Sequence, residues 1–212
     1  DPGVGNMNRW IEVKDALPAL IALATLTAML LIAPAAWAHE PDGDFRGGFM
    51  SGFTHPFYGL DHVAAMVAVG IWGAFLGRPA IWVLPVVFPV IMAVGGVAAI
   101  VGFAVPLIEP VIALSSFALG LAILAKWRAP SAVAGVLVGV FAIFHGHAHG
   151  AELPHATEPA AYAVGFVIST GLLHAAGIAF GLLARLPRGA IALRAVGAVI
   201  AAAGLGFLVG VL

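Results

Sequence analysis

The sequence predicts an all-α membrane protein, a bundle of six transmembrane helices that follows an N-terminal signal peptide. Three observations lead to this fold class. Of the 212 residues, 62% are hydrophobic and only 9% are charged, whereas soluble domains carry about 25% charged residues. The mean hydropathy is +1.09. Beyond residue 50, the apolar residues form six long stretches, separated by short breaks that contain proline, glycine or basic residues.

The first 38 residues read as a short leading segment and a signal peptide. Residues 1–6 precede the first methionine and look like a remnant ahead of the start site. A basic segment, an apolar stretch and the small-residue site Ala36-Trp37-Ala38 follow in the order of a secretory signal. Cleavage after Ala38 would make His39 the mature N-terminus. Alternatively, Ala16–Ala38 is long enough to remain as an uncleaved first transmembrane helix.

Residues 39–212 are expected to form one transmembrane domain of six helices. Each apolar stretch is about 17 to 25 residues long, the length that a helix needs to cross the hydrocarbon core of a bilayer. The connections leave no room for a soluble domain, and several contain proline, which is tolerated at a helix start. The predicted spans are residues 52–77, 80–104, 107–125, 130–150, 159–184 and 189–212.

The basic residues predict how these spans are oriented. Lys and Arg are retained on the cytoplasmic side of a bacterial inner membrane. Here they gather after the first and third spans and between the fifth and sixth, while most acidic residues fall at the other connections. Both mature termini are therefore predicted to face the periplasm. The basic residues concerned are Arg78, Lys126, Arg128, Arg185, Arg188 and Arg194.

The first span opens with a cluster of polar residues that is unusual inside a membrane. On one continuous helix, His55, Gly59, His62 and Met66 would share a face, because residues four and seven positions apart align. Both imidazoles could then address one ion across the small Gly59. Asp61 lies one position round the helix, as a ligand or as a partner that fixes a histidine tautomer.

The fourth span closes with a second cluster. His145, His149 and Glu152 stand at positions i, i+4 and i+7 and share a face, with small residues between them. Two imidazoles at this spacing form a metal chelate, and a carboxylate adds a third donor and negative charge. His147 points to the other side, so its role is weaker. Since Cys is absent, thiolate metal sites are excluded.

The predicted topology brings both clusters to the periplasmic ends of their helices. Glu109, at the start of the third span, joins the same level. Ser115 and Ser116 could offer weak oxygen donors, but serines in transmembrane helices more often bond their own backbone. His174 stands alone deep in the fifth span, either as the next station on a path inward or as a packing contact. His39 could capture metal only if the signal is removed.

Both motifs resemble the signature motifs of the HupE/UreJ proteins, which accompany nickel enzymes such as hydrogenase and urease. The resemblance rests on His55, five residues and then Asp61-His62, and on the run from Phe144 to Glu152. It extends over the whole mature chain, including a glutamate at position 109. It implies a secondary metal permease, mainly for nickel, with cobalt or copper for some members, and it implies these functional residues: His55, Asp61, His62, Glu109, His145, His149 and Glu152.

The residues and the resemblance together predict a carrier that imports a divalent transition metal ion, most of all nickel, from periplasm to cytoplasm. Imidazole and carboxylate suit cobalt, copper and zinc equally well. No prosthetic group is expected. Besides the ion and the bilayer, the expected partners are periplasmic metal donors or cytoplasmic metallochaperones, and no nucleic acid. The alternatives are a membrane metalloenzyme, hydrolase or oxygenase, and a metal sensor or storage protein that uses the same ligands.

Overall fold

The computed structural model describes residues 48–151, 158–182, 186 and 189–211, and the regular structure among them is entirely helical. The predicted signal peptide, His39 and Glu152 lie outside these residues. The helices in chain order are α2 (Gly48–Thr54), the 3-10 turn η1 (His55–Phe57), α3 (Leu60–Leu76), α4 (Ala80–Ile100), α5 (Ile108–Leu124), α6 (Ser131–Ala151), α7 (Pro159–Gly181) and α8 (Gly189–Leu208).

Each of the six predicted spans contains a helix, and four of these helices are long and apolar enough to cross a membrane. They are α4, α6, α7 and α8. A fifth candidate is the bent pair formed by α2 with η1 and by α3. Helix α5 is equally apolar but has only 17 residues. The all-helical fold class is confirmed for the described part of the chain, with four clear candidate spans.

The first predicted span is not one continuous helix, which corrects the sequence prediction for this segment. The chain turns by 82° between η1 and α3. Pro56 is the second residue of the 3-10 turn, and Gly59 leaves the helical region with φ −105° and ψ 111°. Proline lacks the N–H that would continue the preceding helix, and glycine lowers the cost of leaving it. His55 and His62 therefore lie on two separate segments.

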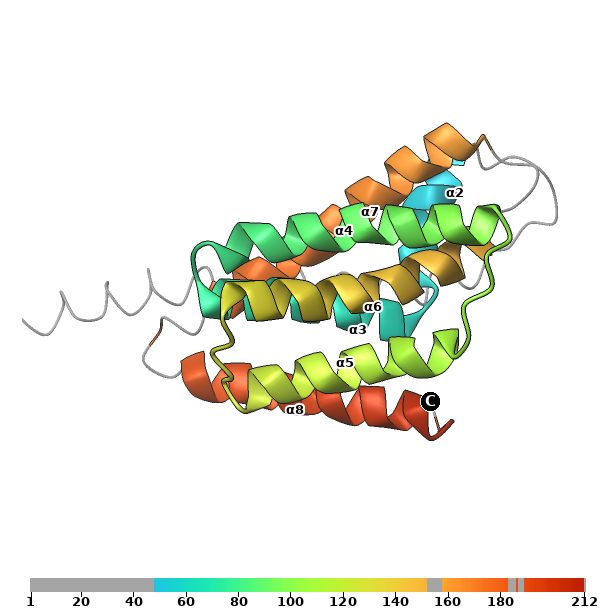
Figure 1. Ribbon diagram of the computed structural model, residues 1–212. Helices are drawn as coiled ribbons and strands as arrows, with labels where there is room; N and C mark the ends of the chain where they lie inside the picture. The colour runs from blue at the N-terminus through green and yellow to red at the C-terminus, as the bar shows by residue number, and fades with distance from the viewer. Residues whose placement is uncertain (1–47, 152–157, 183–185, 187–188, 212) are drawn as a thin grey trace, which may run out of the picture.

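Helix α3 lies at the centre of the bundle. Every residue from Ala65 to Ala74 is buried, and α3 packs against α4, α5 and α7. Figure 1 shows α4 beside α6 on one side and α5 beside α8 on the other. Near its N-terminal end, His62 and Val63 are buried, whereas Leu60 is exposed.

Small residues allow these helices to approach closely. A Cβ added to Gly146 of α6 would overlap the carbonyl oxygen of Met92 in α4, and one added to Gly177 of α7 would overlap the carbonyl oxygen of Val67 in α3. Helices in lipid gain most of their mutual attraction from such close packing. Glycine therefore permits the close approach of α6 to α4 and of α7 to α3.

The two ends of the bundle differ in chemistry. The basic connections after α3 and α5 lie at one end, and the ends of α4 and α6 lie at the other (Figure 1). Along α4, Trp82, Val86, Val90 and Val94 are all exposed, at intervals of one helical turn. A long exposed apolar stripe is typical of a surface covered by lipid. His62 at the start of α3 and His149 at the end of α6 lie at the end opposite to the connections that contain Arg78 and Arg128 (Figure 1).

Candidate metal site

His62 is oriented by the residue before it. The carboxylate of Asp61 accepts a hydrogen bond from the backbone N–H of His62 at 2.8 Å and another from Nδ1 of the same residue at 2.9 Å. A neutral imidazole carries one ring proton, so a proton on Nδ1 leaves the lone pair on Nε2. This Nε2 is buried and has no hydrogen-bond partner among the described residues. This contact corresponds to one of the two roles that the sequence predicted for Asp61, that of a partner that fixes the tautomer of a histidine.

His145 is held from a different helix. The hydroxyl oxygen of Ser115 in α5 lies 2.9 Å from Nε2 of His145, and it also lies 2.6 Å from the carbonyl oxygen of Ile112. The His145 ring is fully buried, and its Nδ1 has no hydrogen-bond partner within the described ranges. The sequence favoured a backbone bond for Ser115 over a role as a weak oxygen donor. It missed the contact with His145, because no local pattern joins the two positions.

His149 lies between the imidazoles of the first motif. Its ring centroid is 4.4 Å from that of His62 and 4.9 Å from that of His55. Phe166 of α7 covers another side, with centroids 4.6 Å apart. Both ring nitrogens of His149 are buried without a hydrogen-bond partner in the described part of the chain. Buried polar atoms are rarely left without a partner, so these nitrogens are candidates for binding a ligand.

We call His55, His62, His145 and His149 the histidine cluster. The rings of His62 and His145 also meet, with centroids 4.8 Å apart and planes at 85°. The rings thus pack edge to face or tilted, and in this arrangement no three His, Asp or Glu side chains of the described residues could hold a metal ion. Since imidazole binds zinc at about 2.0–2.1 Å, binding requires the rings to turn their nitrogens toward a common point.

The ring of Phe88 contacts both the histidine cluster and His174. The ring centroid of Phe88 in α4 is 5.3 Å from that of His145 and 5.4 Å from that of His174. Phe88 is fully buried, and both ring nitrogens of His174 lack hydrogen-bond partners among the described residues. Sequence analysis missed Phe88. A signal was available, because Phe88 lies between Pro85 and Pro89, two prolines inside α4 that each remove a backbone hydrogen bond of the helix.

The other predicted ligands lie outside the histidine cluster. Met66 is fully buried in the hydrophobic core, one turn beyond His62. Glu109 is exposed in the first turn of α5. His147 donates from Nε2 to the carbonyl oxygen of Phe103 at 2.7 Å, in agreement with its predicted position on the other side of the helix. Among the predicted ligands that the structure describes, His55, His62, His145 and His149 are therefore brought together, with Asp61 beside them.

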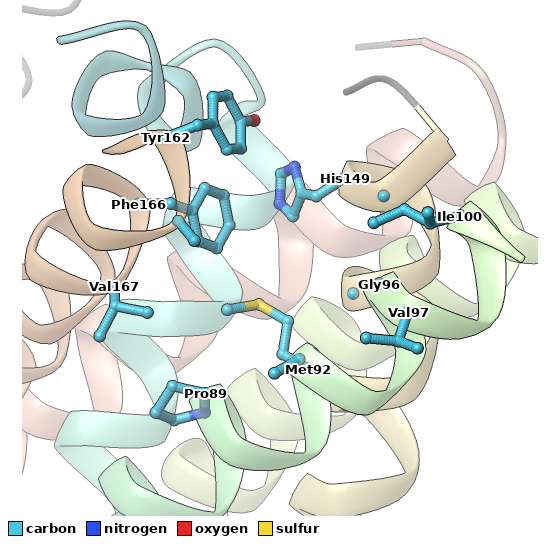
Figure 2. A pocket seen from close by; sticks show the side chains of 13 residues that line it. Pro89, Met92, Gly96, Val97, Ile100, His149, Tyr162, Phe166 and Val167 are labelled. Atoms are coloured by element: carbon cyan, nitrogen blue, oxygen red, sulfur yellow. The ribbon is translucent and has the colours of Figure 1, made fainter. Parts of the chain in front are cut away.

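A cavity of about 240 Å³ adjoins the cluster between α4, α6 and α7. Figure 2 shows His149 at this cavity together with Met92, Tyr162 and Phe166. Apart from His149 and Tyr162, the lining is apolar. The cavity gives the His149 ring free space on one side, which is what a change of ring orientation needs.

Comparison with known proteins shows similarity to one described family and to a curated protein. The family model described as HupE / UreJ protein matches residues 27–207. The chain is also similar to Protein HupE of Rhizobium leguminosarum bv. viciae, with 41% identity over 184 residues, which cover 87% of this chain and 96% of that protein. No solved structure shows a significant match to the chain.

Proposed function

Because this chain belongs to the HupE/UreJ family, we propose that it is a secondary transporter that imports a divalent transition metal ion, with nickel as the preferred cargo. It would sit in the bacterial inner membrane with six crossing helices, the first of them broken at Gly59. The mature termini would face the periplasm, since the basic connections favour the cytoplasmic side. We assign it no enzymatic activity.

The observation that carries this proposal is the histidine cluster itself. The four imidazoles, from η1, α3 and α6, form a chain of ring contacts in the order His55, His149, His62 and His145. Three of them have a buried ring nitrogen without a hydrogen-bond partner among the described residues. Imidazole nitrogen is a ligand that nickel, cobalt, copper and zinc all accept. Desolvated and unpartnered nitrogens gain most from a cation, because they have already lost their bonds to water.

A carboxylate beside the histidine cluster favours the binding of a divalent cation there. A bare dication in the low dielectric of a bilayer is very costly, and neutral imidazoles alone do not offset its charge. Asp61 lies beside His62 and supplies one negative charge. Glu109 and Glu152, on the same predicted level, would attract the hydrated ion before it enters. The ion would then exchange part of its water for the nitrogens of the histidine cluster.

The route inward is proposed to pass Phe88 and reach His174. His145 and His174 are the imidazoles that the Phe88 ring contacts within the described ranges. Phe88 offers no donor atom, so it would block an ion until it moves. Pro85 and Pro89 remove two backbone hydrogen bonds of α4 around it, which makes bending of α4 less costly there. Met66 would offer a thioether on the same route.

Transport of radiolabelled nickel into proteoliposomes tests the proposal. Wild-type protein should admit nickel down its gradient, and His149→Gln should reduce the initial rate roughly 10-fold or more, as loss of metal-site partners generally does. His147→Gln is the matched control, because it changes a histidine of the same helix that bonds Phe103 instead of the cluster. Nickel binding without entry would contradict the carrier and favour a metalloenzyme or a sensor.

A further inference from the structure

We infer that Ser115 is a positioning residue that selects Nδ1 of His145 as the atom that binds the transported ion. The inference rests on the proposed function, and it adds a residue and an atom that the motifs do not specify. Ser115 belongs to α5, whereas His145 belongs to α6.

The proton of the Ser115 hydroxyl is committed to its own helix. Its oxygen lies 2.6 Å from the carbonyl oxygen of Ile112. Two oxygen atoms at that separation are held by a proton between them, and a carbonyl has none to give. Ser115 is therefore the donor in this bond. Because a hydroxyl has only one proton, it must act as the acceptor in its contact with His145.

This fixes the tautomer of His145. The contact of 2.9 Å joins the Ser115 oxygen to Nε2 of His145, so Nε2 carries the ring proton. The lone pair of the neutral ring then lies on Nδ1, which is buried and has no hydrogen-bond partner among the described residues. The other tautomer would leave a buried N–H on Nδ1 without an acceptor, which costs about 1–3 kcal/mol.

The arrangement mirrors that of His62. There the carboxylate of Asp61 holds the proton on Nδ1 and leaves the lone pair on Nε2. The two rings, with centroids 4.8 Å apart, thus use opposite nitrogens. Ser116, the next residue of α5, donates to the backbone oxygen of Asp61 at 2.8 Å. Adjacent serines of α5 therefore brace both sides of the histidine cluster.

The tautomer can be measured without any metal. We propose two-bond ¹H–¹⁵N correlation spectra of ring-labelled histidine in the detergent-solubilised protein, with His145 assigned by its missing signals in His145→Gln. Wild type and Ser115→Thr, which keeps the hydroxyl, should show His145 protonated on Nε2. Ser115→Ala should show a mixture or the opposite tautomer. Protonation of His145 on Nδ1 in the wild type would overturn the inference.

The donor atom can be identified with ¹¹³Cd²⁺ as a probe. A one-bond cadmium coupling should appear on Nδ1 of His145 and on Nε2 of His62. Coupling to other histidines but not to Nδ1 of His145 would overturn this inference and leave the proposed function intact. If neither ¹¹³Cd²⁺ nor Ni²⁺ binds the wild type, the proposed function fails as well.

Nickel affinity gives the matched comparison between variants. Ser115→Ala should bind nickel roughly 10- to 100-fold more weakly, the usual cost of removing a partner of a metal-binding histidine. Ser115→Thr should stay close to the wild type. Ser169→Ala is the control, since Ser169 is equally buried and its hydroxyl has no hydrogen-bond partner within the described ranges. Equal affinities of Ser115→Ala and the wild type would overturn the inference.

Discussion

The imidazole rings of His62 and His149 lie with their centroids 4.4 Å apart. His62 stands in the first turn of α3 and His149 in the last turn of α6. These helices make little direct contact along the rest of their length, and α4 and α5 lie against both of them. The contact therefore belongs to one end of the bundle, and it joins the two histidine motifs of the chain into one site.

Double substitution tests whether these two histidines bind the same ion. Nickel affinity should be measured for His62→Ala, His149→Ala and the double variant. Two ligands of one ion act together, so the double variant should lose less nickel-binding free energy than the two single losses added. The coupling energy should be about 0.5–3 kcal/mol. The control pair is His62→Ala with His147→Ala, for which the two losses of nickel-binding free energy should add. Additive costs for His62 and His149 would mean that they serve separate ions.

Replacement of Asp61 separates its charge from its hydrogen bond. The oxygen of an asparagine can still accept the proton of His62 Nδ1, whereas alanine cannot. Asp61→Ala should weaken nickel binding roughly 10- to 100-fold, and Asp61→Asn should weaken it less. Titration calorimetry with nickel measures both. Equal and large losses in the two variants would instead indicate that the Asp61 carboxylate contacts the ion.

Gly59→Ala should disturb the same hydrogen bond by steric means. A Cβ at this position would lie 2.6 Å from Nδ1 of His62 and 2.9 Å from Oδ1 of Asp61. Both side chains belong to the contact that orients His62, so one of them must move. Nickel affinity should fall roughly 10- to 100-fold, as for loss of Asp61.

Gly171→Ala is the control for Gly59→Ala. A Cβ at Gly171 would meet no atom within 4 Å, so its nickel affinity should equal that of the wild type. Normal binding by Gly59→Ala would show that the histidine cluster adapts without the contact between Asp61 and His62.

Gly146→Ala tests the packing that brings α6 against α4. The added Cβ would overlap the carbonyl oxygen of Met92, and overpacking of this kind costs about 1–3 kcal/mol. The midpoint of thermal unfolding in detergent should therefore fall. Gly135 lies on the same helix with nothing within 4 Å of its Cβ position, so Gly135→Ala should leave the midpoint nearly unchanged. Equal midpoints would refute the close approach of the two helices.

Several features of the site follow from the sequence because they are local or topological. Apolar stretches of membrane-spanning length predicted the helices. Because successive spans cross the membrane in opposite directions, the sequence also predicted that the start of the first span and the end of the fourth span lie at the same membrane level. The contact between His62 and His149 agrees with that level. The prediction that His55 and His62 share one helical face was wrong, because it assumed a continuous helix across Pro56 and Gly59.

Residue types and spacing determined by themselves that this chain is helical and apolar, and which polar side chains stand within its helices. Only the tertiary structure decided which of them meet. Asp61 accepts a hydrogen bond from His62, and Ser115 of α5 contacts His145 of α6. The ring of Phe88 packs against that of His174. The physical reason is that hydrophobic length fixes how a helix crosses a membrane, but not its rotation. The facing residues are chosen by side-chain packing between helices, which no single segment encodes.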